Sequence, residues 1–251
     1  MITRIHHVAV AVQDLEAALG FWRHALELPL LREAELPDQG VRAALLACGP
    51  CELEVLAPTG PDTGVARFLA SRGEGLHHVC FESDDVVREV RRFVGTAVDM
   101  LDAKPRQGLA GRIAFVHPRA CAGLLVELAT PPEPASLPET SLALVALHGK
   151  VEDVGAAAQR FQDLFGMTRG LAADDGSFVQ LTLAGLMLQL TPLGPGFPKP
   201  ALSALRLKTG DLPGLARRLE ERGIQCHQNP VGLVVTSGPA RGAPLIVEPD
   251  R

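Results

Sequence analysis

Apolar and polar residues follow the same order four times along the chain. Each time, an Asp followed by Leu or Val opens an amphipathic helical stretch, at Asp14, Asp85, Asp153 and Asp211. An Asp carboxylate in this position accepts hydrogen bonds from the free backbone N–H groups of a first helical turn. The spacings of 71, 68 and 58 residues suit one supersecondary unit each. The sequence therefore predicts four helices, each in a copy of one unit.

The first and third helical stretches carry apolar residues at matching positions. Residues spaced by three and four share one face of a helix, so each set predicts a buried stripe. All six pairs are separated by 139 residues, which identifies the stretches as copies. The members are Leu15, Ala18, Leu19, Trp22, Ala25 and Leu26 in the first, and Val154, Ala157, Ala158, Phe161, Leu164 and Phe165 in the third.

Strand-like runs surround these helices in the order strand, helix, three strands. This order predicts an α+β fold of four βαβββ modules that form two domains in tandem. A proline-rich segment separates the halves, so we expect domains at 1–131 and 141–251 with a linker at 132–140. The predicted strands are 5–12, 41–47, 52–57, 113–116 and 124–128 in the first half, and 142–147, 178–183, 186–190, 202–207, 231–235 and 245–247 in the second.

Composition narrows the classes of partner. The net charge is −5, with one Trp and no Tyr, so we expect no nucleic acid partner. No apolar run reaches membrane-spanning length and no leader pattern precedes the first strand, so we expect no membrane partner. Five cysteines in a chain of 251 residues indicate reduced thiols. Together these features predict a soluble cytoplasmic protein with enough apolar residues for two moderate cores.

Four polar residues stand out on otherwise apolar strand faces. Alternation along 5–12 puts His7 on one face with small alanines, which leave space beside the imidazole. The same alternation selects Glu54, His78 and Glu127, whereas His6 and His77 fall on the opposite pleat and are interpreted as structural. Two imidazoles and two carboxylates suit a divalent ion such as Co²⁺, Ni²⁺, Zn²⁺, Fe²⁺ or Mn²⁺. The alternative is four unrelated polar residues on half-exposed strands.

Cys48-Gly-Pro-Cys51 reproduces the tetrapeptide of a thioredoxin-like dithiol. That chemistry needs a helix N-terminus to lower the thiol pKa. The motif instead joins two strand-like runs, and Gly-Pro is typical of a hairpin turn. We therefore expect a turn here.

Several ordered motifs in the first half closely resemble methylmalonyl-CoA epimerases: Ile5-His-His-Val-Ala-Val-Ala-Val12, Glu52-Leu-Glu-Val-Leu-Ala-Pro58, Gly73-Glu-Gly-Leu-His-His78, Ile113-Ala-Phe-Val-His-Pro118 and Gly123-Leu-Leu-Val-Glu-Leu128. The resemblance implies paired βαβββ modules of the vicinal-oxygen-chelate (glyoxalase and dioxygenase) superfamily, and a metal held by His7, Glu54, His78 and Glu127. It also implies epimerisation of a 2-methyl-branched dicarboxyl-CoA through an enolate, with Glu127 as one acid/base residue.

Two parts of that site stay open. Ala43 stands where some members of the family carry a glutamate proposed as the second acid/base, and Glu33, Glu35 and Glu52 are unranked candidates for the role. Lys104, Arg106 and Arg112 add cations in a loop near Glu127, where they are candidates to hold an anionic acyl-CoA. An ordinary solvated hairpin loop explains the same three residues.

The second half keeps one of the four ligand positions. Ala146, Leu188 and Ala204 replace the first three, and only Glu248 remains, with His148 and Gln189 as nearby polar strand residues. One carboxylate does not hold a divalent ion against water, so we expect no metal there. The chain then resembles a fused pseudo-dimer, either monomeric or a homodimer, whose degenerate half covers apolar surface or senses a ligand.

Other functions remain for comparison. A lactoylglutathione lyase of the glyoxalase I type is the nearest enzymatic alternative, because its family uses a His/Glu/His/Glu set. An extradiol dioxygenase needs two His and one Glu with open positions for oxygen, and Glu54 would fill a fourth position. A non-catalytic binding protein of this superfamily generally lacks the ligand set.

Overall fold

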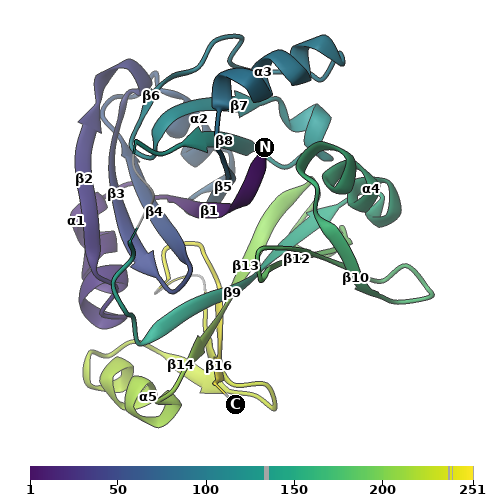
Figure 1. The fold of residues 1–251 in the computed structure, drawn as a ribbon. Coiled ribbons are helices and arrows are strands. Elements are labelled where there is room, and N and C mark those ends of the chain that lie inside the picture. The colour runs from purple at the N-terminus through teal and green to yellow at the C-terminus, as the bar shows by residue number, and fades with distance from the viewer. Residues whose placement is uncertain (133–135, 237, 239, 251) are drawn as a thin grey trace. The chain divides into compact units, whose positions relative to one another are not determined.

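The computed structural model describes residues 1–132, 136–236, 238 and 240–250 (Figure 1). Its strands form two sheets of eight, ordered β2-β3-β4-β1-β5-β8-β7-β6 and β10-β11-β12-β9-β13-β16-β15-β14. The first comprises β1 (Ile2–Ala11), β2 (Leu30–Leu36), β3 (Val41–Cys48), β4 (Cys51–Pro58), β5 (Gly75–Ser83), β6 (Arg106–Gly108), β7 (Gly111–Val116) and β8 (Val126–Thr130). The second comprises β9 (Leu142–Val151), β10 (Thr168–Ala172), β11 (Val179–Leu183), β12 (Leu186–Pro192), β13 (Ala201–Thr209), β14 (Cys226–Gln228), β15 (Leu233–Val235) and β16 (Leu245–Pro249).

The predicted order of strand, helix and three strands is confirmed in all four modules. The module helices are α1 (Leu15–Leu19), which continues as a π-helix over Gly20–Ala25, then α3 (Val86–Gly95), α4 (Val154–Phe165) and α5 (Leu212–Glu221). An additional helix, α2 (Gly64–Arg72), connects the first two modules and was not predicted. The α+β class is therefore correct, with one helix more than the sequence pattern indicated.

The four aspartates cap their helices as predicted. Each carboxylate accepts a hydrogen bond from the backbone N–H three residues further on, at 2.8–3.1 Å. All twelve apolar residues predicted on the first and third helical stretches are buried. Local capping and an apolar stripe thus determine where the first and third helices start and which face they bury.

The chain divides into two compact units that both draw on each half of the sequence. The first unit contains Met1–His7, His77–Ala135 and Ala146–Ser203, and the second contains Val8–Leu76, Ser136–Val145 and Ala204–Arg251. The domain limits at 131 and 141 stay a prediction. Residues 133–135 of the predicted linker lie outside the described residues.

Aromatic side chains form part of the core of the first unit. Phe81 on β5 stacks on Phe165 of α4, with ring centroids 4.3 Å apart and planes 5° from parallel. Phe161 on α4 and Phe93 on α3 also pack against Phe165, with centroids 5.3 and 6.0 Å away. This core therefore joins residues from the two halves of the sequence.

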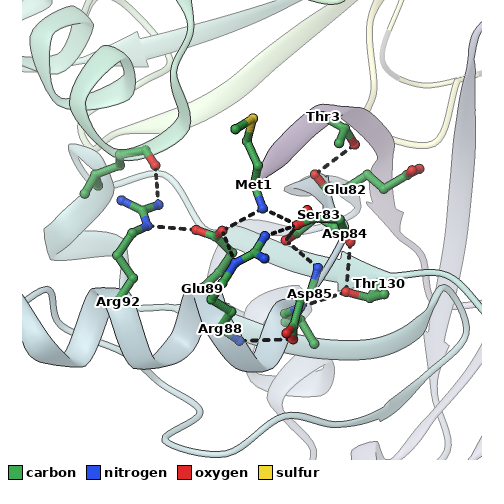
Figure 2. Close-up of polar contacts among 12 residues, drawn as sticks. Met1, Thr3, Glu82, Ser83, Asp84, Asp85, Arg88, Glu89, Arg92 and Thr130 are labelled. Carbon is green, nitrogen blue, oxygen red and sulfur yellow. Dashed lines mark hydrogen bonds and ion pairs between the residues drawn. The ribbon is translucent and has the colours of Figure 1, made fainter.

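Ion pairs anchor the start of β1 in the first unit (Figure 2). The Met1 ammonium contacts the Asp84 carboxylate and lies 3.0 Å from Glu89 on α3. Arg92 donates a hydrogen bond of 2.8 Å to Glu89 and another of 2.8 Å to the carbonyl oxygen of Leu164 on α4. The network ties β1, which carries His7, to the turn after β5, which carries His78.

The turn between β3 and β4 in the second unit contains the Cys-Gly-Pro-Cys motif. Cys48 and Cys51 are register partners across the hairpin, and Gly49 adopts a φ of +71°. Neither of these two cysteines forms a disulfide, and both are buried. The predicted turn is confirmed, and no helix N-terminus follows the motif. Among the described residues, no helix combines the length and the apolar character needed to cross a membrane.

Candidate metal centre

Two histidines from successive modules meet in the first unit. His7 lies on β1 and His78 on β5, and both side chains are buried. Their Nε2 atoms are 3.2 Å apart, with the ring planes at 72°. The two residues are 71 positions apart in the sequence, the same offset that separates the capping Asp14 and Asp85. The module repeat therefore supplies one imidazole from each copy.

Glu127 on β8 brings a carboxylate to the same point. Its Oε2 atom lies 3.2 Å from Nε2 of His7 and 3.5 Å from Nε2 of His78. Burial alone would raise the pKa of Glu127, but hydrogen bonds from His7 and His78 outweigh it and hold this pKa well below its usual range. The carboxylate is thus ionised and is aimed at two imidazole nitrogens.

The spacing of these atoms fits a common cation. Bonds of about 2.0–2.2 Å from a divalent metal to imidazole nitrogen and carboxylate oxygen place neighbouring ligand atoms about 3.0–3.5 Å apart. The three observed separations are 3.2, 3.2 and 3.5 Å. Three of the four predicted ligands are therefore assembled in one unit, with the mixed nitrogen and oxygen set that Zn²⁺, Co²⁺ or Fe²⁺ accepts.

Each of these histidines contacts the histidine that precedes it. Nδ1 of His7 lies 2.9 Å from Nδ1 of His6, and Nδ1 of His78 lies 2.9 Å from Nδ1 of His77. Simple pleat alternation placed His6 and His77 on the opposite face, and it gave no indication of these contacts.

Phe115 and Arg106 extend the site beyond the ligands. Phe115 on β7 is the register partner of Glu127 and packs edge-on against His78. The Arg106 guanidinium on β6 stands 5.6 Å from the centroid of the Phe115 ring and pairs with Asp102 at 3.3 Å. Asp102 also accepts a hydrogen bond of 2.9 Å from the Phe115 backbone N–H. Phe115 was not singled out in the sequence, although alternation from Ile113 places it on the Glu127 face.

The strand register separates the three predicted acyl-CoA cations. Arg106 pairs with Ile113, which is two residues from Phe115 and so on the Glu127 face. Arg112 pairs with Gln107 and Thr130 and therefore projects from the opposite face. Lys104 is exposed in the segment before β6. The structure brings Arg106, but not Arg112, to the face of the candidate centre.

Glu54 belongs to the second unit, where it is buried on β4 opposite Leu45 of β3. Glu52 is also buried and lies two residues away on the same face of β4. Ala43 shares that face, since it pairs with Leu56.

The register also ranks the carboxylates proposed for the second acid/base. Glu33 and Glu35 pair with Ala44 and Arg42, so both project from the face opposite Ala43 and Glu54. Glu33 is moreover ion-paired with Arg42. Of the three, only Glu52 lies on the Glu54 face, and it is buried.

The corresponding positions of the second half lack this set. Ala146 and Leu188 are buried apolar residues of the first unit. In the second unit Glu248 lies 2.5 Å from Nε of Arg206, an ion pair without hydrogen-bond geometry. The surviving carboxylate is therefore neutralised by a guanidinium. His148 and Gln189 are register partners on β9 and β12, and Gln189 accepts a hydrogen bond of 3.3 Å from Gln180.

Four βαβββ modules in two mixed sheets, with imidazole and carboxylate groups gathered on a sheet face, define the vicinal-oxygen-chelate class of proteins. A family model described as Glyoxalase/Bleomycin resistance protein/Dioxygenase superfamily matches residues 6–115. The chain belongs to this superfamily.

Relatives that match the first half of the chain point to one family within this superfamily. Human mitochondrial methylmalonyl-CoA epimerase is 35% identical over 127 residues, which are 50% of this chain and 72% of that protein. A solved structure of methylmalonyl-CoA epimerase in complex with methylmalonyl-CoA and NH4+ is 35% identical, with a TM-score of 0.51 over 53% of this chain and 96% of that one. The resemblance predicted from the motifs is confirmed.

A mutant of 4-hydroxymandelate synthase from Streptomyces coelicolor extends the likeness to the second half. It is 22% identical and has a TM-score of 0.71, over 91% of this chain and 77% of that one. At this identity the likeness concerns the fold alone, and it agrees with the predicted tandem of vicinal-oxygen-chelate folds.

Proposed function

We propose that this chain is a metal-dependent epimerase of a 2-methyl-branched dicarboxyl-CoA such as methylmalonyl-CoA. The observation that carries the proposal is the buried cluster of His7, His78 and Glu127, whose ligand atoms lie 3.2–3.5 Å apart. Relatives of the same segment, at about one third identity, are methylmalonyl-CoA epimerases. The metal class and the acyl group are parts of this proposal.

Glu54 completes the proposed ligand set. Its carboxylate is buried on β4, which neighbours β1 in the strand order of the first sheet. His7, Glu54 and His78 are of the residue types and degree of burial that suit a metal ion. A divalent ion held there would withdraw electrons from a thioester carbonyl and make the neighbouring C–H bond more acidic. Co²⁺, Ni²⁺, Zn²⁺, Fe²⁺ and Mn²⁺ are all compatible with the donors.

Proton transfer and substrate binding are assigned to side chains on the faces that carry Glu127 and Glu54. Glu127, held ionised, is the proposed base on one side of the reacting carbon. Glu52 is the candidate on the other side, because it alone of the three carboxylates lies on the Glu54 face. Arg106 supplies a cation for the anionic acyl-CoA. The described residues of the second half keep only Glu248 of the four ligand positions, and Arg206 pairs with it, so the proposal places one metal centre in the chain.

Solvent exchange tests the proposal directly. Chelator-treated protein reloaded with Co²⁺ is incubated with methylmalonyl-CoA in D₂O, and deuterium at C2 is measured by mass spectrometry. We expect exchange that requires the metal, disappears in His78→Ala and persists in His24→Ala, an exposed control on the helix that follows α1. Lactoylglutathione formation without any C2 exchange would overturn the proposal in favour of a glyoxalase I-type lyase.

A further inference from the structure

Two histidine pairs repeat one arrangement in the first unit. His6 and His7 begin one module, and His77 and His78 begin the next, again 71 residues later. In each pair the Nδ1 atoms are 2.9 Å apart, and the rings are nearly perpendicular, at 82° and 75°. The ring centroids are 5.1 and 5.2 Å apart. Two modules that differ at most other positions thus preserve the same contact beside each proposed ligand.

The two ring nitrogens of each proposed ligand histidine face different groups. Nε2 of His7 and Nε2 of His78 face each other and Glu127, where the cation would bind. Nδ1 of each ring faces Nδ1 of the preceding histidine. A hydrogen bond between two Nδ1 atoms needs one protonated and one unprotonated nitrogen. If the ligand donates, its proton sits on Nδ1 and its Nε2 lone pair is free.

The Glu127 carboxylate favours the other tautomer of the ligand histidines. Glu127 lies within reach of both Nε2 atoms and, as an acceptor, favours a proton on them. A metal can bind Nε2 only when that proton has gone. The ligand imidazoles therefore have to shift the proton to Nδ1 as the ion enters, and an acceptor already placed at Nδ1 stabilises the shifted form.

We propose that His6 and His77 are positioning residues that accept the Nδ1–H of His7 and His78 and so hold both ligands in the metal-binding tautomer. The inference rests on the metal centre proposed above, and it deepens it by assigning the groups that support two of its ligands. Hydrogen-bond partners of this kind orient metal-bound histidines and commonly change metal affinity by about 10- to 100-fold.

Metal affinity provides the first test. Co²⁺ binding to chelator-treated protein is measured by competition with a chromophoric chelator, for His6→Phe and His77→Phe, which keep a ring but remove the acceptor. We expect a loss of affinity of about 10- to 100-fold in each variant, and recovery of part of it in His6→Asn and His77→Asn, which restore an acceptor. His24→Phe is the exposed control and keeps wild-type affinity.

A spectroscopic test separates positioning from packing. In Zn²⁺-loaded protein with ¹⁵N-labelled histidine, we expect two ring Nδ1–H signals, from His7 and His78, that exchange slowly with solvent. Each signal should exchange faster only in the variant of its own neighbour. Wild-type exchange and affinity in both folded Phe variants would overturn the proposal.

A further outcome concerns Cys80. His6, His7 and Cys80 have ligand atoms within 4.8 Å of one another and are also a possible metal group. If Cys80 is a ligand, Cd²⁺-loaded protein shows a thiolate absorption band, and Cys80→Ser loses both this band and affinity for Co²⁺. That result would identify His6 as a ligand and overturn its positioning role. Because none of these measurements uses a substrate, their result is independent of whether the protein is an epimerase.

Discussion

Phe115 packs the edge of its ring against His78, with the ring centroids 5.1 Å apart and the planes at 86°. The Arg106 guanidinium lies over the same phenyl ring. A cation is thereby held on the face of the candidate centre by an aromatic side chain that also touches a proposed ligand. Arg112, only six residues later, projects from the other face of β7.

This difference predicts unequal effects of two similar substitutions. Arg106→Ala should raise the KM for methylmalonyl-CoA by about 10- to 100-fold, since a hydrogen bond to a charged group contributes about 1.5–3 kcal/mol. Arg112→Ala should change KM by less than about twofold, as expected of an exposed cation on the opposite face of β7. Steady-state kinetics of the two variants, each loaded with the same metal, provides the comparison. Equal effects of both substitutions would contradict the face assignment.

A second prediction concerns Glu52, the proposed second acid/base residue. Glu52→Gln preserves size and removes the proton-transfer group, so kcat for epimerisation should fall by about 10²- to 10⁴-fold with little change in KM. Glu33→Gln, on the opposite face and paired with Arg42, is the matched control and should keep kcat.

Single-turnover exchange in D₂O identifies the affected step. If Glu52 serves one face of the substrate carbon, the Glu52→Gln variant should still exchange the C2 proton of one methylmalonyl-CoA epimer while failing to interconvert the two. Normal epimerisation by this variant would rule Glu52 out as the second acid/base.

The sequence predicted the elements whose pattern is local. Capping aspartates and apolar stripes located the four module helices, and apolar runs located the inner strands. The strands β2, β6, β10 and β14 were not named, and all four lie at the ends of their sheets. Every residue of β10 is exposed. An edge strand contacts one neighbour and needs little apolar surface, so its sequence carries no strong pattern.

The residues of the candidate site likewise differ in whether a local sequence pattern predicts them. Alternation within one strand was sufficient to select His7, His78 and Glu127, because each stands on an apolar strand. The positions of Arg106 and Arg112 depend on how β6 pairs with β7, and a one-residue change of register exchanges the two faces. The His6 and His77 contacts were missed because adjacent residues of a regular strand point to opposite sides, whereas these rings meet at Nδ1.

The cysteines give a prediction about chemical reactivity. Burial raises the pKa of the Cys48 thiol to about 12, and burial likewise raises the pKa of Cys121. With a pKa of about 12, only about one thiol in ten thousand is ionised at pH 8, and the thiolate is the nucleophile. Iodoacetamide at pH 8 should therefore modify the half-buried Cys226 first and leave the other four cysteines unmodified until the protein unfolds.

Mass spectrometry of peptides after timed alkylation measures each site. Cys226→Ser should abolish the fast phase, and raising the pH towards 12 should accelerate the modification of Cys48 in the folded protein as its thiolate forms. Rapid modification of Cys48 or Cys51 at pH 8, or a disulfide between them, would revive the dithiol interpretation.

The last prediction concerns what the second half does for the first. Phe81 and Phe93 come from the first half of the sequence and are fully buried, partly against Phe165 on α4. A fragment that ends at residue 131 lacks α4 and leaves these rings without that cover. Burying one Phe contributes about 1.5–3 kcal/mol, and the total stability of a domain is only about 5–15 kcal/mol.

We therefore expect the fragment 1–131 to aggregate, or to associate with itself through the uncovered rings, even though it holds all four proposed ligands. In the full chain, Phe165→Ala should lower the free energy of unfolding by about 3–5 kcal/mol, while Leu171→Ala, at an exposed position of β10, should have little effect. Urea unfolding of both variants and light scattering of the fragment test this. A monomeric fragment as stable as the full chain would show that the first half is independent, and would leave the second half free for a separate role such as ligand sensing.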